Sequence, residues 1–71
     1  MALIMMDPNR IGMNLKGLMK SLDMTQTELA NRTGLTQAAV SQIINNERLP
    51  SLDSLCRILV VIPVTFERLC K

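Results

Sequence analysis

Residues 25–46 read TQTELANRTGLTQAAVSQIINN, and this stretch predicts two short helices joined by a tight turn. Thr25 stands where the N-cap of a helix belongs, and Glu28 follows three residues later. This pattern is typical of a capping box, in which two otherwise unpaired backbone N–H groups are satisfied reciprocally. Thr33 and Gly34 then end the first helix, because glycine readily takes the left-handed conformation that a helix C-terminus often needs.

The second helix of this stretch is expected to begin at Thr36, which serves as its N-cap. Val40, Ile43 and Ile44 follow at the spacing of a helical apolar stripe, so this face should be buried. Ala30 lies on the preceding helix, and its small side chain allows the two helices to cross closely. The stretch is therefore interpreted as a helix-turn-helix unit.

The polar face of the second helix carries short, uncharged side chains. No acidic residue lies within 36–46. A glutamine amide can bond adenine at N6 and N7 together, and an alanine methyl can contact the methyl group of thymine. Gln26 stands at the other helix's N-terminus, where N–H groups and the helix dipole favour a phosphate. The face is interpreted either as a solvated surface or as a reader of DNA bases, and its residues are Gln37, Ala38, Ser41 and Gln42.

The same stretch resembles the helix-turn-helix of the lambdoid phage repressors and Cro proteins, the Xre-type DNA-binding regulators. The resemblance extends upstream to Ile11-Gly12, Leu15 and Leu18, and downstream to the segments 49–55 and 64–69. Within the helix-turn-helix, the shared elements are Met24-Thr25-Gln26, Glu28-Leu29-Ala30, Gly34-Leu35-Thr36-Gln37, Val40-Ser41 and Ile43.

The resemblance implies an all-α, compact five-helix, lambda-repressor-like domain spanning residues 1–71, with the helix-turn-helix at its second and third helices. It implies that the third helix enters the major groove and reads base edges with the polar face defined above. It also implies contacts to the DNA backbone from the helix N-termini and from the loop after the third helix, although ordinary loop chemistry also accounts for the loop residues. The expected backbone contacts are Thr25, Gln26, Thr36, Asn45, Asn46 and Arg48.

Composition sets bounds on these interpretations. A chain of 71 residues makes one small domain, which buries about 60% of its extended surface. Apolar residues make up 48% of the chain, but Phe66 is its only aromatic residue, so aliphatic side chains and methionine must build the core. The formal net charge of +2 is only mildly basic, and charge alone would not indicate a nucleic-acid partner.

The titratable and nucleophilic residues do not indicate an enzyme or a cofactor. There is no histidine, and two cysteines cannot complete a four-ligand zinc site. Cys56 is expected to be a buried thiol on the apolar face of a helix, and Cys70 an exposed one. Both are expected to be free, with a disulfide as the alternative. The chain shows neither paired carboxylates at a useful spacing nor a phosphate-binding glycine loop. We therefore expect a non-enzymatic protein without a metal or cofactor.

No targeting segment is recognised. The apolar run at 2–6 lacks a basic region and is too short for a signal peptide. No stretch approaches the roughly 18 apolar residues of a membrane span. The chain is expected to be cytoplasmic, and residues 1–7 are expected to form a flexible arm.

The first helix is expected to run to about Leu22, with Asp7 or Asn9 as its N-cap and Pro8 in its first turn. Gly12 weakens it by about 1 kcal/mol relative to alanine, and Gly17 does the same, so tertiary packing must hold it. Met19 stands where the family usually has an arginine. The expected apolar stripe, at spacings of four, three and four, is Ile11, Leu15, Leu18 and Leu22.

The fourth helix is expected to begin after Ser51 as N-cap, with Asp53 favourably placed in its first turn. Pro63 discourages helical geometry at Ile62, so the helix should end near Val61. Its expected buried face is Leu52, Leu55, Cys56 and Leu59, with Ile58 adjacent.

The run at 58–62 is apolar throughout and cannot all face one core, so part of it should be exposed. Such a patch on a small domain usually marks an interface, although a locally rearranged core is the alternative. Thr65 is expected to cap a fifth helix carrying Phe66 and Leu69. In the resembling family this region forms the dimer contact. The expected interface residues are Val60, Val61, Pro63, Val64 and Phe66.

These interpretations converge on a sequence-specific, double-stranded-DNA-binding transcriptional regulator. A repressor of phage or prophage type, acting as a homodimer on a palindromic operator, is the main hypothesis. An antitoxin-type autoregulator, or the DNA-binding domain of a longer regulator that also binds a protein partner, has the same DNA surface. A pure protein-interaction module that retains the helix-turn-helix as a scaffold is the alternative from a different class.

Overall fold

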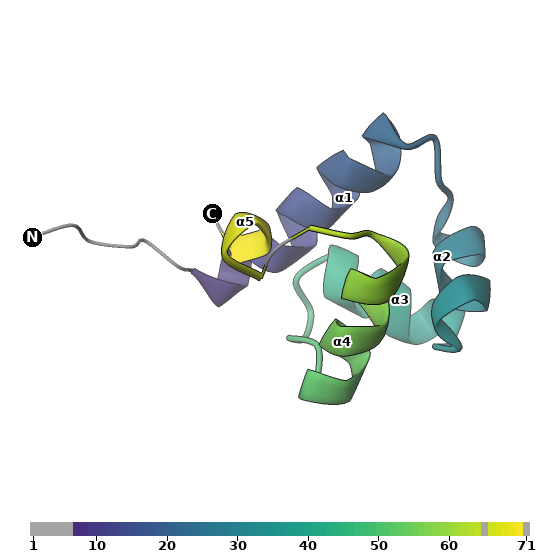
Figure 1. Ribbon diagram of the computed structural model, residues 1–71. Helices are drawn as coiled ribbons and strands as arrows, with labels where there is room; N and C mark the ends of the chain where they lie inside the picture. The colour runs from purple at the N-terminus through teal and green to yellow at the C-terminus, as the bar shows by residue number, and fades with distance from the viewer. Residues whose placement is uncertain (1–6, 65, 71) are drawn as a thin grey trace, which may run out of the picture.

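The computed structural model describes residues 7–64 and 66–70, which form helices and no strand. A short 3-10 turn, η1, precedes five α-helices (Figure 1). The expected arm therefore lies, apart from Asp7, outside the described residues, as does the Thr65 cap. The elements are η1 (Pro8–Arg10), α1 (Ile11–Ser21), α2 (Gln26–Thr33), α3 (Gln37–Ile44), α4 (Leu52–Val61) and α5 (Phe66–Cys70).

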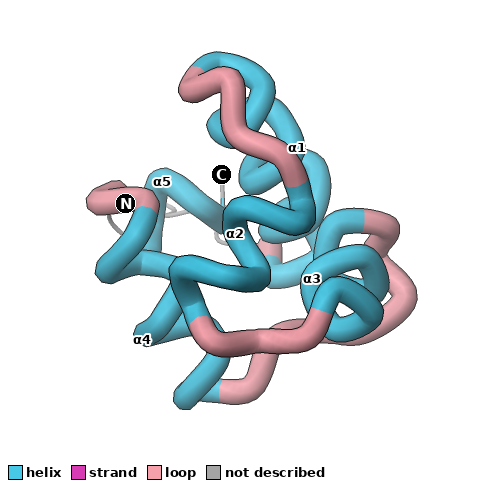
Figure 2. The backbone as a smooth tube through the Cα atoms, turned by 90° about the vertical axis from the view of Figure 1, so that its right-hand side faces the viewer, coloured by secondary structure: helices cyan, strands magenta, loops and turns pink. Residues whose placement is uncertain are grey.

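The five-helix, all-α fold expected from the sequence is confirmed. α1 packs against α3 and α5, while α2 packs against α3 and α4. The 3-10 turn η1 lies against both α1 and α5, which brings the beginning and the end of the described chain together (Figure 1). Short loops join the successive helices (Figure 2). This arrangement sets α2 and α3 side by side on the body formed by the other helices.

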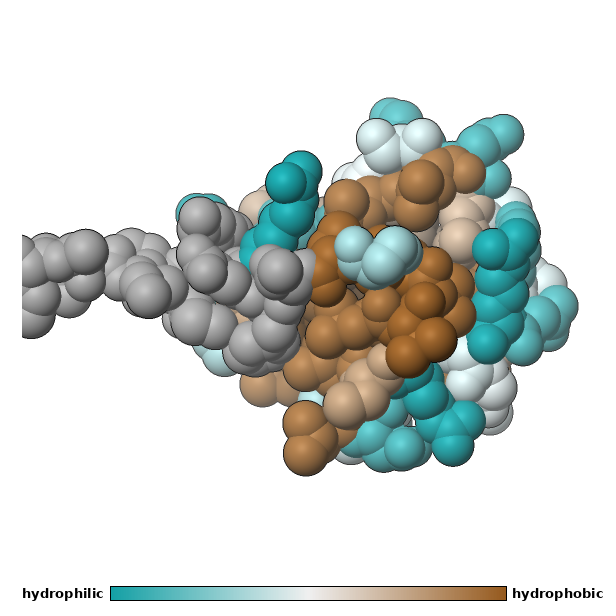
Figure 3. Space-filling view, in the orientation of Figure 1, coloured by the Kyte–Doolittle hydropathy of each residue, from teal (hydrophilic) through white to brown (hydrophobic). Residues whose placement is uncertain are grey.

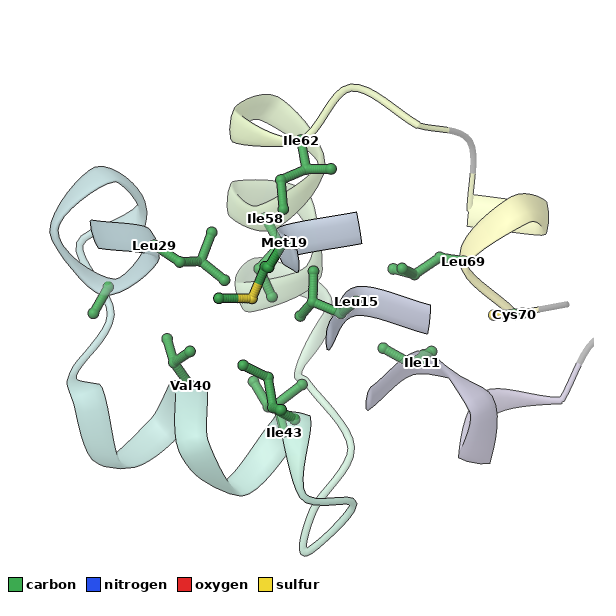
Figure 4. Close-up of a cluster of buried hydrophobic side chains, with 12 residues drawn as sticks. Ile11, Leu15, Met19, Leu29, Val40, Ile43, Ile58, Ile62, Leu69 and Cys70 are labelled. Atoms are coloured by element: carbon green, nitrogen blue, oxygen red, sulfur yellow. The ribbon is translucent and has the colours of Figure 1, made fainter. Parts of the chain in front are cut away.

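One cluster of apolar side chains, drawn from all five α-helices, forms the core (Figure 4). It is built from aliphatic residues, methionine and cysteine, as the near absence of aromatic residues predicts. Branched side chains from α3 and α4 meet α1 at its centre (Figure 4). Its members are Ile11, Leu15, Met19, Leu29, Ala30, Val40, Ile43, Ile44, Ile58, Ile62, Leu69 and Cys70.

The buried face of α1 differs from the expected stripe at one end. Leu15 and Met19 are buried, Leu18 is half-buried, and Leu22 is 54% exposed. The helix ends at Ser21, so Leu22 leaves the helical face before it reaches the core. Met19, which lies four residues after Leu15, takes that place.

The beginning of the described chain confirms one of the two expected caps. Asp7 Oδ1 accepts a hydrogen bond from Asn9 N at 3.0 Å, with Pro8 in the first turn. This cap opens η1 rather than α1, which follows directly. Asp7 therefore forms a cap as expected, but on the 3-10 turn, and the N-cap of α1 itself is Arg10, which makes no side-chain capping bond.

α4 buries only part of the face expected, with Leu55 and Leu59 half-buried against the core. Ser54 and Ile58 are buried, whereas Cys56 is exposed and Leu52 is 78% exposed. The prediction of a buried Cys56 is wrong because α4 carries two apolar rows, and packing against α2 selects the other one. The predicted end of the helix at Val61 is confirmed.

Cys70, expected to be exposed, is only 1% exposed. α5 lies against α1 and η1, and Asp7 N donates a hydrogen bond to the Cys70 carbonyl at 2.9 Å. Burial raises the pKa of the Cys70 thiol, and the nearby negative charge of Asp7 raises it further. Both cysteines are free, as predicted, but their exposures are the reverse of the expected ones.

Polar contacts from α1 and η1 hold the two ends of the core together. Asn14 Nδ2 donates to the Leu69 carbonyl at 2.7 Å, which fixes α5 on α1. Asn46 Nδ2 donates to the Asn9 carbonyl at 2.6 Å, which fixes the loop after α3 on η1. Gly12 lies against the carbonyl oxygens at the end of α3, so this part of α1 approaches α3 more closely than a side chain would allow.

Candidate nucleic-acid interface

α2 begins with the cap expected from the sequence. Thr25 Oγ1 accepts a hydrogen bond from Glu28 N at 3.1 Å, which satisfies one of the unpaired N–H groups of the first turn. The reciprocal half of the capping box is not formed between these two residues. The Glu28 carboxylate instead pairs with Arg32 at 2.9 Å, because the residue four positions on lies on the same helix face.

The turn between α2 and α3 is held from two sides. Gly34 takes the predicted left-handed conformation (φ 78°), and its N–H donates to the Ala30 carbonyl at 2.9 Å. Arg57, on α4, donates from Nη1 to the Thr33 carbonyl at 3.1 Å and from Nε to Asp53 at 3.0 Å. Nothing in the sequence of α2 indicated this clamp, which fixes the turn on the body of the domain.

α3 buries one face and presents the other. Thr36 Oγ1 accepts from Ala39 N at 3.0 Å, as predicted for its N-cap. Val40 and Ile43 are each 1% exposed and attach the helix to the core. The four candidate base-reading residues share the outward face. Gln37 and Ala38 are exposed, whereas Ser41 and Gln42 are half-buried.

Gln37, the first residue of α3, is held by α2. Its side-chain Nε2 donates a hydrogen bond to Thr27 Oγ1. Sequence reasoning did not single out Thr27, because a threonine ten residues earlier gives no local signal of this contact. The bond leaves the Gln37 amide oxygen to accept further hydrogen bonds, and it restricts the side chain on the outward face.

The loop after α3 also contacts the outward face. Asn45 Nδ2 donates a hydrogen bond to Ser41 Oγ at 3.2 Å, and Arg48 Nη1 donates one to Gln42 Oε1 at 3.4 Å. Asn46 takes a left-handed backbone (φ 61°), and its amide group binds η1 instead. Two of the three loop residues expected at the DNA backbone therefore lie beside candidate base-reading side chains.

A groove of about 340 Å³ opens between α1 and the beginning of α2. Lys16 and Lys20, both exposed, contribute positive charge next to the N-terminus of α2. These two lysines were not among the predicted contact residues, although their spacing of four places them on one face of α1. The groove is lined by Lys16, Met19, Lys20, Met24, Thr25, Gln26 and Ile44.

The residues expected at a dimer interface differ in exposure. Val60 is 82% exposed and Pro63 is exposed. Val61 and Val64 are half-buried against the core, and the side chain of Phe66 lies outside the described part of the chain. The expectation that part of the run at 58–62 is exposed is confirmed by Val60.

Comparison with known proteins is consistent with this geometry. A helix-turn-helix family model matches residues 15–69, which covers α2, α3 and the turn between them. No curated protein and no solved structure matches the chain. Within residues 7–64 and 66–70, no helix has the length and apolar character needed to cross a bilayer. Proteins of this family are typically non-enzymatic DNA-binding transcriptional regulators. The chain belongs to the Xre/lambda-repressor-like helix-turn-helix family.

Proposed function

We propose that this protein is a sequence-specific, double-stranded-DNA-binding transcriptional regulator that acts as a repressor. The observation that carries the proposal is the outward face of α3, where uncharged donor and acceptor groups are held by neighbouring side chains. Such groups can match the donor and acceptor pattern of the major groove. The proposed place of action is the cytoplasm, and the proposed origin is a phage or prophage, in keeping with the family.

In the proposed complex, α3 enters the major groove and α2 lies across the DNA backbone. Gln37, Ala38, Ser41 and Gln42 face base edges, and the backbone contacts come from Thr25, Gln26, Thr36, Asn45, Asn46 and Arg48. Lys16 and Lys20 add positive charge beside the N-terminus of α2, where a phosphate is favoured. These phosphate contacts set the position of the protein, whereas the α3 face supplies the sequence preference.

A homodimer on a palindromic operator completes the proposal. One small module forms few base contacts, and two copies would read half-sites about 34–36 Å apart. Val60, Val61, Pro63, Val64 and Phe66 are the proposed contact residues, and the exposure of Val60 supports this choice. The same exposed apolar side chains also favour a second candidate function, an antitoxin-type autoregulator whose partner covers this surface.

Substituting Val60 by lysine tests the dimer. The change places an ammonium group in the proposed apolar contact, and we expect cooperative binding to a palindromic site to weaken by about tenfold or more. Analytical ultracentrifugation and a DNA-binding titration measure the two effects. Because Val60 is 82% exposed, the fold should be unaffected. Unchanged self-association together with unchanged DNA affinity would contradict the interface assignment.

Substituting Thr27 by valine tests how the α3 face is held. Valine has nearly the shape of threonine but no hydroxyl group, so Gln37 loses its partner on α2. We expect about a two- to tenfold loss of preference at the base pair that Gln37 reads, the effect of one hydrogen bond. Thr27→Ser keeps the hydroxyl and should retain the preference. A preference equal to that of the wild type in Thr27→Val would contradict a positioning role.

Selection of bound sequences from a random DNA pool, at near-physiological salt, tests the function as a whole. An enriched inverted repeat with half-site centres about one helical turn apart is the expected result. If no DNA sequence is enriched and binding disappears as the salt concentration increases, α3 does not read the DNA sequence. In that case the protein-interaction hypothesis would replace the proposal.

A further inference from the structure

The loop after α3 is polar and exposed. All four of its residues, 45–48, are exposed and carry amide or charged side chains. By contrast, a hydrophobic surface extends over the following helix, α4, on the face turned toward the viewer in Figure 3. Arg48 is the cation of this loop, and within residues 7–64 and 66–70 it forms no ion pair. Its charge is therefore available to a negatively charged partner such as DNA.

The backbone turns back after α3 and brings Arg48 against Gln42. The turn lies at Asn46, which has a left-handed backbone (φ 61°) and whose amide group is held by the Asn9 carbonyl. The Gln42 carbonyl accepts hydrogen bonds from Glu47 N at 2.8 Å and from Arg48 N at 3.3 Å. Arg48 Nη1 also donates to Gln42 Oε1 at 3.4 Å. The guanidinium is therefore held beside the outward face of α3.

The contact with Arg48 decides which way round the Gln42 amide lies. A guanidinium has N–H donors and no acceptor, so the Gln42 amide oxygen must face it. The Gln42 amide nitrogen is then left to donate, and the remaining N–H groups of Arg48 donate beside it. Gln37 is held by its nitrogen instead, which leaves its oxygen to accept. The end of the outward face near the loop therefore presents a pair of donor side chains.

Guanine is the base whose major-groove edge matches a pair of donors. It presents two acceptors, N7 and O6, whereas adenine presents one acceptor and one donor, and thymine presents one acceptor beside its methyl group. Opposite adenine, the N6 donor would face the donors of the protein. A donor that loses water without gaining an acceptor costs free energy, so adenine is disfavoured at this position.

We propose that Gln42 and Arg48 read one guanine together, with Gln42 Nε2 and the Arg48 guanidinium donating to its N7 and O6. This inference rests on the proposed DNA-binding function, and it moves Arg48 from the backbone contacts to the base-reading residues. A backbone contact carries no sequence information, so the two roles differ in what they do to base preference. Because Arg48 is already held by Gln42, it loses less conformational freedom when it binds a base.

The test compares base preference in the wild type and in Arg48→Ala. Fluorescence anisotropy measures affinity for the site selected from the random pool and for the same site with each other base at the guanine position. We expect the wild type to prefer guanine over adenine by about five- to 150-fold, the discrimination of a good bidentate contact. In Arg48→Ala the Gln42 oxygen is free, so its amide can bond adenine at N6 and N7 together. The preferred base should therefore change from guanine to adenine.

Two further variants locate the effect and control for charge. Gln42→Ala should lose the guanine preference at the same position. Lys20→Ala removes an exposed cation beside the N-terminus of α2, where a phosphate contact is proposed. It should weaken binding to all the bases equally and keep guanine preferred. Arg48 is exposed, and its backbone N–H bond does not depend on its side chain, so Arg48→Ala should keep the fold, which circular dichroism checks.

The outcomes separate this inference from the proposed function. If Arg48→Ala behaves like Lys20→Ala, with weaker binding and an unchanged base preference, Arg48 is a backbone contact. The inference is then overturned while the DNA function stands. The same holds if the position that depends on Gln42 and Arg48 carries a base other than guanine. If the pool yields no enriched sequence, the proposed function fails, and base reading by Arg48 fails with it.

Discussion

Replacing Gly12 with alanine is expected to lower the free energy of unfolding by about 1–3 kcal/mol or more, as overpacking of a close contact does. A Cβ atom at this position would lie 2.4 Å from the Ile43 carbonyl oxygen and 2.8 Å from that of Ile44. These are backbone atoms, so the contact is relieved only if the end of α3 moves away from α1. Because α3 carries the candidate reading face, DNA binding should fall together with stability.

The matched control is the same substitution at Gly17, on the same helix. An added Cβ there meets nothing within 4 Å, so Gly17→Ala should stabilise the protein by about 0.5–1 kcal/mol. Urea denaturation followed by circular dichroism measures both changes. A Gly12→Ala protein as stable as Gly17→Ala would show that α1 and α3 are not in the close contact described above.

Replacing Gln37 with alanine is expected to weaken binding to the selected operator by about 1–3 kcal/mol, or about five- to 150-fold, the value of a bidentate base contact. Gln37 is exposed at the beginning of α3, and its partner Thr27 is also exposed, so the fold should be retained. Fluorescence anisotropy titrations with the operator and with random DNA measure the effect. Binding to random DNA should change little, because phosphate contacts supply it.

Gln26→Ala provides the comparison for this prediction. Gln26 is exposed at the first position of α2, where a phosphate contact is proposed, so its loss should weaken binding to both DNAs to a similar extent. Because both variants truncate a glutamine to alanine, comparing them separates the effect of a base contact from that of a backbone contact. If Gln37→Ala weakened binding to random DNA as much as binding to the operator, a base-reading role for Gln37 would be excluded.

The local structure of the helix-turn-helix was determined by the sequence itself. Thr25 and Thr36 accept the predicted capping bonds, and Gly34 adopts the predicted left-handed turn. The buried stripe of α3 and the end of α4 at Val61 are also as predicted. Each of these features depends on interactions within a few residues, such as a cap, a helical repeat or a proline two positions on. A single sequence carries that information directly.

Tertiary structure alone decided which of several plausible apolar faces is buried. α4 has apolar residues on two sides. Of the four residues expected to be buried, Leu55 and Leu59 are half-buried against the core, whereas Leu52 and Cys56 are exposed and the adjacent Ile58 is buried. The contacts of Thr27 with Gln37 and of Arg57 with Thr33 join residues ten and 24 positions apart. Helical periodicity sets which residues share a face. It does not set which face meets a neighbour, because that choice depends on how the other helices cross.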